Sequence, residues 1–96
     1  MNHEIETIAN YVCEYYGVTA DMIKSPNRQY ELVKARNMLL LLAGQGKDYK
    51  VATYLNRDRT TMVNNRKNFL GNMRYNKPLE REFIRLKNGL IQFEIA

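Results

Sequence analysis

The stretch Asn56-Arg57-Asp58-Arg59-Thr60-Thr61-Met62-Val63 decides the fold predicted for this chain. It places two bases, one acid and two hydroxyls in front of an apolar pair. Asp58 is a good helix N-cap, because its carboxylate can accept a hydrogen bond from a free N–H in the first turn. The apolar residues of this segment fall on one helical face, namely Met62, Val63, Phe69, Leu70 and Met73. The sequence therefore predicts a helix over about 58–74.

The opposite side of this predicted helix carries hydrogen-bonding side chains. They are Thr60, Asn64, Lys67 and Asn68, at spacings of i, i+4, i+7 and i+8. A helix with such a stripe beside a polar, basic N-terminus suits insertion into the major groove of DNA, where Asn can pair with adenine and Thr can contact the thymine methyl. A solvated surface helix carries the same pattern, so the stripe alone leaves both interpretations open.

A shorter helix is predicted directly before this one. Asp48 is expected to cap a helix that runs through Leu55, and Asn56-Arg57 is expected to form a tight turn. A short helix, a brief turn and a second helix with a polar N-terminus make the helix-turn-helix plan. We therefore predict a helix-turn-helix over about 48–74.

Apolar residues recur at helical spacing in the rest of the chain as well. Further helices are predicted over 4–16, after the N-cap Thr19, over 30–43, and from Pro78 onward. The alternating residues Ile91, Phe93 and Ile95 could pack on the core, form an edge strand or make a dimer contact. We predict an all-α domain of five to six helices. Residues 1–76 would form the helix-turn-helix domain, and residues 77–96 an added helix and tail that pack on it or dimerise.

Length and composition restrict the class of protein. Ninety-six residues with 45% apolar side chains make one small globular domain. The longest apolar run has six residues and the chain starts with acids, so we expect no membrane span, no signal peptide and a cytoplasmic location. A single Cys13 and a single His3 offer no disulfide and no metal cluster. Paired carboxylates and nucleophile–base pairs are missing too, so we predict no enzyme, no cofactor and no metal.

Positive charge is concentrated in the middle of the chain. Residues 1–23 contain four acids and no Lys or Arg, which gives −4. Residues 24–77 contain twelve Lys or Arg against three acids, which gives +9, and residues 78–96 are balanced. The basic block coincides with the predicted helix-turn-helix, as expected of a protein that binds a polyanion.

Three stretches resemble, in the same order, the C-terminal DNA-binding domain of the bacterial chromosomal replication initiator DnaA. Residues 8–18 are similar to the family's opening helix, which ends in a Tyr-Tyr pair. Residues 33–41 resemble its long helix, where an Arg precedes an apolar run. Residues 57–63 resemble its signature Arg-Asp-His-Thr-Thr followed by apolar residues. The resemblance covers about residues 5–73, with Arg59 in place of the family's His and Asn56 in place of a Gly.

The resemblance implies an all-helical domain whose signature helix enters the major groove of a short, A·T-rich box of double-stranded DNA. It implies that the signature side chains contact base edges, and the polar stripe extends that set. The predicted base contacts are Asp58, Arg59, Thr60, Thr61 and Asn64. In the family a basic residue of the loop before the long helix reaches the minor groove, and Arg28 matches that position best.

Other basic residues near these positions are expected to touch the DNA backbone. Lys34 and Arg36 lie in the N-terminal half of the long helix, where they could flank a bound strand. Lys50 is expected to point outward from the first helix of the pair. The predicted backbone contacts are Lys34, Lys50, Arg57 and Lys67.

We therefore predict a sequence-specific double-stranded DNA-binding protein in replication or transcription control, which could act as a homodimer. The chain holds no candidate for the nucleotide-binding module of a full initiator, so we expect a stand-alone reader such as a phage or mobile element would carry. The alternative is a protein-interaction module that binds replication proteins or dimerises through the helix at 78–96. RNA binding is less well supported, because most tyrosines lie in helical segments where packing explains them.

Overall fold

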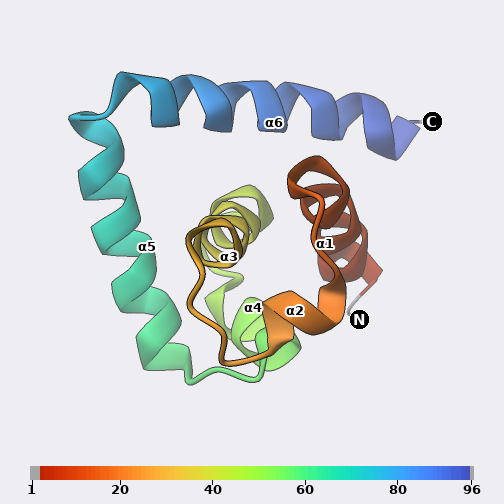
Figure 1. The fold of residues 1–96 in the computed structure, drawn as a ribbon, viewed down its shortest axis with the longest axis vertical. Coiled ribbons are helices and arrows are strands. Elements are labelled where there is room, and N and C mark those ends of the chain that lie inside the picture. The colour runs from red at the N-terminus through yellow and green to blue at the C-terminus, as the bar shows by residue number, and fades with distance from the viewer. Residues whose placement is uncertain (1–2, 96) are drawn as a thin grey trace.

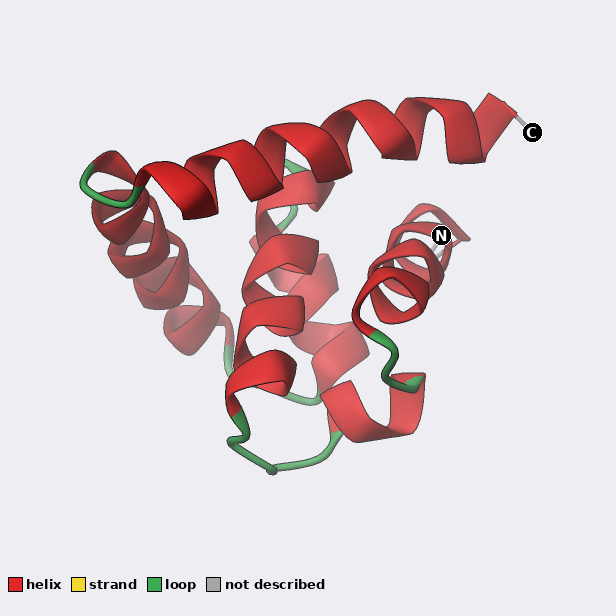
Figure 2. Cartoon of the chain, turned by 45° about the horizontal axis from the view of Figure 1, so that its top comes forward, coloured by secondary structure: helices red, strands yellow, loops and turns green. Residues whose placement is uncertain are grey.

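The computed structural model describes residues 3–95, with side chains for residues 4–92, and all its regular structure is helical. Figures 1 and 2 show these helices joined by short loops. The helices are α1 (His3–Tyr16), α2 (Ala20–Lys24), α3 (Tyr30–Ala43), α4 (Asp48–Leu55), α5 (Arg59–Arg74) and α6 (Lys77–Ile95). The predicted all-α class and the helix-turn-helix plan, formed by α4 and α5, are confirmed.

Helix α3 is the centre of the core. In Figure 1 it is viewed nearly end-on, with α1 and α5 on opposite sides of it and α6 across one end of the bundle. Its apolar run explains this place, because Met38, Leu39 and Leu40 are at most 1% exposed and pack against the surrounding helices. Burying each such side chain contributes about 1.5–3 kcal/mol. Val33, in the N-terminal half of the same helix, is by contrast 37% exposed.

The ends of the first two helices follow the sequence signals. Gly17 ends α1 with a φ of 68°, a left-handed conformation that a side chain would disfavour. Thr19 caps α2 as predicted, since its hydroxyl accepts a hydrogen bond from the Met22 N–H at 3.2 Å. The end of α1 at Gly17 and the cap at Thr19 leave only a short connection between the two helices. Helix α2 packs against α1 and α3.

Helix α6 continues through Ile95, so the edge-strand alternative for residues 91–95 is wrong. It packs against α1 and α5, and its own Leu86 is fully buried in the core. The Tyr11 hydroxyl donates to the Leu86 carbonyl at 2.8 Å, and Gly89 gives the Tyr11 ring room against the helix. The glycine within this helix is therefore explained by the close approach of a tyrosine from α1.

A second contact joins α6 to α1 and α3. The Tyr16 hydroxyl donates to one oxygen of Glu82, and burial followed by this hydrogen bond raises the pKa of Tyr16. The Lys34 ammonium lies 3.4 Å from the other oxygen of Glu82. The division of the chain at residue 76 stays a prediction, but residues 77–92 pack on the helices before them.

Candidate nucleic-acid interface

The turn between α4 and α5 is built around Asn56. Its φ of 56° is left-handed, a conformation that asparagine adopts more readily than most residues. Arg57 continues the turn, and its N–H donates to the Ala52 carbonyl at 2.8 Å. Asn56 thus supplies the backbone geometry that a glycine would give, and α5 starts two residues after Arg57.

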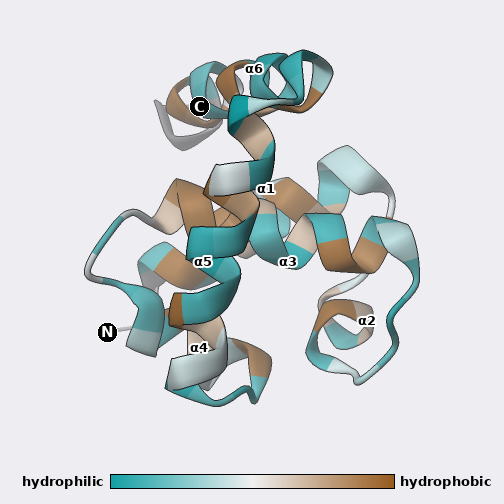
Figure 3. Ribbon diagram, turned by 90° about the vertical axis from the view of Figure 1, so that its left-hand side faces the viewer, coloured by the Kyte–Doolittle hydropathy of each residue, from teal (hydrophilic) through white to brown (hydrophobic). Residues whose placement is uncertain are grey.

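The N-terminal half of α5 presents its polar side chains to solvent. Met62 is buried in the core with Phe69 packed against the same cluster, and Met73 is buried too, as predicted. Val63 and Leu70 are exposed, contrary to the prediction that they share this apolar face, because the buried side is narrower than the sequence pattern indicated. Most of α5 is hydrophilic in Figure 3. The exposed polar residues of its first three turns are Arg59, Thr60, Thr61, Asn64, Lys67 and Asn68.

Asp58 occupies the N-cap position of α5, but its side chain makes no capping hydrogen bond. Its backbone is extended, and its carbonyl accepts from the Met62 N–H at 3.2 Å. The prediction that its carboxylate caps the helix is therefore wrong. The exposed carboxylate and the first N–H groups of α5 remain available to a ligand.

We expect Asp58→Ala to change the free energy of unfolding by less than about 0.5 kcal/mol, because no capping bond is lost. Thr19→Ala is the matched control, since that hydroxyl does cap a helix and its loss should cost about 1 kcal/mol. Urea denaturation of the two variants measures both values. A loss of 1 kcal/mol for Asp58→Ala would show that the carboxylate caps α5 in solution.

Asp48 does not cap α4, contrary to the prediction, because Lys47 occupies the N-cap position. The carboxylate of Asp48 instead binds Arg66 of α5, with Nε at 2.8 Å and Nη2 at 2.7 Å from the same oxygen. Arg66 Nη2 also donates to the carbonyls of Leu40 and Gly44 at 2.7 and 2.9 Å. Arg66 fixes α5 against α3 and α4. The only sequence signal for Arg66 is its place between the apolar positions of α5, which is too weak to predict this role.

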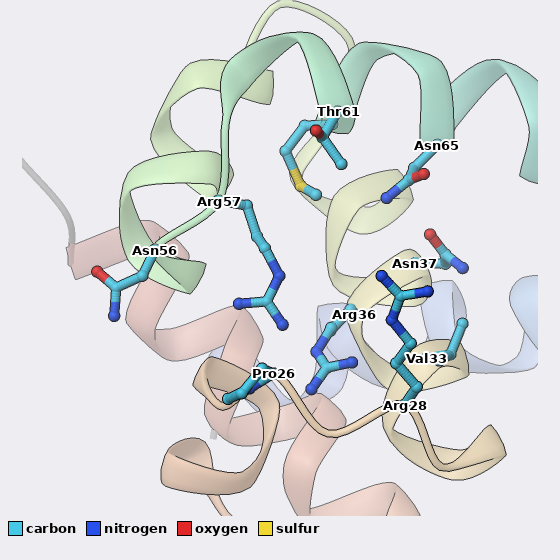
Figure 4. Close-up of a pocket in the computed structure, with 10 residues that line it drawn as sticks. Pro26, Arg28, Val33, Arg36, Asn37, Asn56, Arg57, Thr61 and Asn65 are labelled. Carbon is cyan, nitrogen blue, oxygen red and sulfur yellow. The ribbon is translucent and has the colours of Figure 1, made fainter.

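A pocket of about 520 Å³ opens between the start of α5, the side of α3 and the loop that joins α2 to α3. Figure 4 shows Arg28 and Arg36 on the α2–α3 side of the pocket and Arg57 reaching in from the α4–α5 turn. Thr61 and Asn65 lie on its α5 side. Three guanidinium groups and no carboxylate therefore line a concave surface beside the predicted recognition helix. The lining residues are Pro26, Arg28, Val33, Arg36, Asn37, Asn56, Arg57, Thr61, Met62 and Asn65.

Two of these guanidinium groups are bound to backbone carbonyls. Arg36 is 8% exposed and donates to the carbonyls of Met22, Ile23 and Ser25. Its pKa is lowered, by burial first and by the neighbouring Arg57 charge second. Arg36 was expected to lie on the surface and flank a bound DNA strand, but it is buried instead.

Arg57 is also held by carbonyls. Nη1 donates to Lys24 at 3.2 Å and to Leu55 at 2.7 Å, and Nη2 donates to Ser25 at 2.6 Å. Within the described residues, neither Arg57 nor Arg36 lies within ion-pair distance of a carboxylate. The pocket consequently keeps a positive charge that the protein does not neutralise.

The remaining predicted site residues lie on four different segments of the chain. Arg28 is exposed in the α2–α3 loop at the pocket, and Lys67 is exposed on α5. Lys50 lies on α4, its ammonium 6.0 Å from the ring centre of Tyr49. Lys34 is only 18% exposed and is bound to Glu82 and the Tyr30 ring, so the structure separates it from the other site residues.

A cluster of metal-binding side chains and a membrane-spanning helix are both absent from the described part of the chain. No group of three or more His, Cys, Asp or Glu among residues 3–95 is arranged to hold a metal ion. None of the described helices combines the length and apolarity that crossing a bilayer requires.

Comparison with known proteins matches most of the chain to one family. A family described as "Bacterial dnaA protein helix-turn-helix" matches residues 5–68. The matched region includes α1 to α4 and the N-terminal part of α5, and it excludes α6. A comparison with curated proteins found no match. Because the match covers two thirds of the chain and includes the complete pocket, the chain belongs to the family of bacterial DnaA helix-turn-helix domains.

Proposed function

We propose that this protein binds double-stranded DNA sequence-specifically, with the N-terminal half of α5 in the major groove. The observation that carries the proposal is the uncompensated basic pocket directly beside the exposed polar side of α5. Membership of a DNA-binding helix-turn-helix family supports the same conclusion. Phosphate contacts fix the register of a protein on DNA, and base contacts read the sequence, so the two surfaces have complementary tasks.

The pocket suits one phosphate of the DNA backbone. Arg28 and the amides of Asn37 and Asn65 point toward it, and the uncapped N-terminus of α5 adds N–H groups that favour an anion. A backbone seated there would have the major groove on its α5 side and the minor groove on its Arg28 side. Arg28 would then enter the minor groove, where the strong negative potential of narrow A·T-rich sequences favours arginine.

The base-reading set in this proposal is Asp58, Arg59, Thr60, Thr61 and Asn64. Lys67 of α5 and Lys50 of α4 would touch phosphates of the bound duplex. A protein that occupies a defined DNA sequence can control replication or transcription. The proposal includes this regulatory role and a cytoplasmic location. A homodimer on two adjacent boxes is compatible with the exposed position of α5.

Selection of bound sequences from a random duplex pool tests the proposal, followed by titration of the selected box at several salt concentrations. We expect one enriched A·T-rich box and an affinity that falls steeply as salt rises, because neutralised phosphates release counterions. A protein-interaction module would enrich no box. Failure to enrich any sequence would overturn the proposed function.

The base-reading residues should affect specificity without affecting stability. Thr60→Ala and Asn64→Ala should each flatten discrimination at one or two positions of the box, by about 1–3 kcal/mol per base contact. Both side chains are exposed, so the melting temperatures should hardly change. Titrations with the selected box and single-base variants, beside melting curves, measure both effects. Full discrimination in both variants would exclude α5 as the reader.

The contact between Lys67 and a phosphate should appear in the salt dependence. Lys67→Ala should weaken binding to all duplexes about equally and reduce the slope of log K against log salt by about one. Lys87→Ala is the matched control, since Lys87 is exposed on α6 and outside the proposed surface. An altered sequence preference for Lys67→Ala would instead make Lys67 a base reader.

A further inference from the structure

The carbonyl oxygen of Ser25 accepts hydrogen bonds from two guanidinium groups. Arg36 Nη2 reaches it at 2.7 Å from α3, and Arg57 Nη2 reaches it at 2.6 Å from the α4–α5 turn. Two positive groups so close together repel each other, and the backbone carbonyls that they bind offset that repulsion. Placing the two guanidinium groups here therefore has an electrostatic free-energy cost that two solvent-exposed arginines would not have.

The same two side chains bind three of the last backbone carbonyls of α2. The last carbonyls of a helix have no partner within it. Arg36 bonds the carbonyls of Met22 and Ile23, and Arg57 bonds that of Lys24. A five-residue helix is far too short to be stable alone, so these contacts fix where α2 ends.

The loop that follows continues this ordered segment. The Ser25 hydroxyl accepts from the Asn27 N–H at 3.3 Å, and the Asn27 amide oxygen accepts from the Gln29 N–H at 2.9 Å. Arg28 lies in the chain between Asn27 and Gln29, whose N–H groups make these bonds. It follows by three residues Ser25, whose carbonyl binds Arg36 and Arg57. Its backbone position is consequently determined from Ser25 onward.

Arg57 is also adjacent to the start of α5. It precedes the N-cap residue Asp58, and its Nη1 bonds the Leu55 carbonyl at the end of α4. One planar side chain thus joins the helix-turn-helix to the loop that carries Arg28. A lysine could not replace it, because an ammonium cannot span carbonyls from two segments in a fixed plane.

We infer that Arg57, with Arg36, is a positioning residue that holds the Arg28 loop at a fixed distance from the N-terminus of α5. This inference rests on the proposed function, in which Arg28 and α5 occupy adjacent grooves. Holding the loop in its bound position before DNA arrives removes an ordering cost from binding. Arg57 has three of its five N–H donors committed inside the protein, so its main role is not that of a phosphate ligand.

A double-mutant cycle between Arg57→Lys and Arg28→Ala tests the inference, with affinities measured on the selected box. In the wild-type background Arg28→Ala should weaken binding about tenfold. In the Arg57→Lys background it should weaken binding less than about twofold, because the loop no longer presents Arg28. Equal losses in both backgrounds, with Arg57→Lys binding as tightly as wild type, would make Arg57 a simple phosphate contact and overturn the inference.

Amide hydrogen exchange without DNA separates this inference from the proposed function. Arg57→Lys should accelerate exchange at Asn27 and Gln29 several-fold, while Arg59→Lys, at an exposed position of the same signature, should not. Should Arg57→Lys fail to fold, Arg57→Gln, which keeps a neutral donor, takes its place. Unchanged exchange at both amides refutes the inference even if DNA binds; accelerated exchange upholds it even if no duplex binds and the proposed function fails.

Discussion

Replacing Arg66 with alanine should lower the free energy of unfolding by about 3 kcal/mol, the typical cost of breaking a largely buried ion pair. The side chains of Arg66 and Asp48 are 12% and 15% exposed, so solvent screens their interaction only weakly. The substitution would leave the Asp48 carboxylate without its cation. It would also leave the carbonyls of Leu40 and Gly44 without the donor that joins them to α5.

Urea denaturation of Arg66→Ala measures this loss. Arg81→Ala is a suitable control, because Arg81 is exposed on α6 and should change stability by less than about 0.5 kcal/mol. Arg66→Lys should recover only part of the loss, since a lysine cannot bind a carboxylate and two carbonyls in one plane. A loss below 1 kcal/mol for Arg66→Ala would show that α5 is held by its apolar contacts alone.

Gly89→Ala should destabilise the protein by about 2 kcal/mol, in the range found for overpacked cores. A Cβ at this position would overlap the Tyr11 hydroxyl, which is itself hydrogen-bonded to the Leu86 carbonyl. Tyr11 would have to move, and α6 would separate from α1. Thermal or urea denaturation measures the loss.

Gly71→Ala is the matched control for that experiment. Gly71 is also within a helix, and a Cβ there would meet nothing within 4 Å. This substitution should stabilise the protein by about 0.5–1 kcal/mol, because alanine is the better helix former. Gly89→Ala should also cost less in a Tyr11→Phe background, where the overlapping oxygen is gone. Equal stabilisation by both Gly→Ala changes would contradict the close contact between α1 and α6.

Helix positions were predictable from the sequence because their signals are local. The bounds of α3 match the prediction at both ends, since apolar periodicity begins at Tyr30 and Gly44 stops it. Thr19 was recognisable as a cap for the same reason. The signature at residues 57–63 is specific enough to predict both the helix-turn-helix and the family from the sequence.

The assignment of individual charged side chains was less predictable. Lys34 and Arg36 were predicted to be surface cations. Lys34 instead binds Glu82 of α6, and Arg36 binds carbonyls at the end of α2. Asp48 was expected to cap its own helix and instead binds Arg66, eighteen residues away in the chain. These partners depend on how the helices pack, and packing between distant segments leaves no periodic signal in the sequence.

The position of the acidic first helix has a consequence for how fast the protein finds its target. Glu6 and Glu14 are exposed on α1, which lies across α3 from α5 (Figure 1), whereas the uncompensated arginines lie at the pocket beside α5. Opposite charges on opposite sides give the molecule an electric dipole. In the field of a polyanion the dipole exerts a torque that turns the α5 side forward before contact. A larger fraction of diffusive encounters would then begin in a productive orientation, and this kinetic advantage would decline with ionic strength.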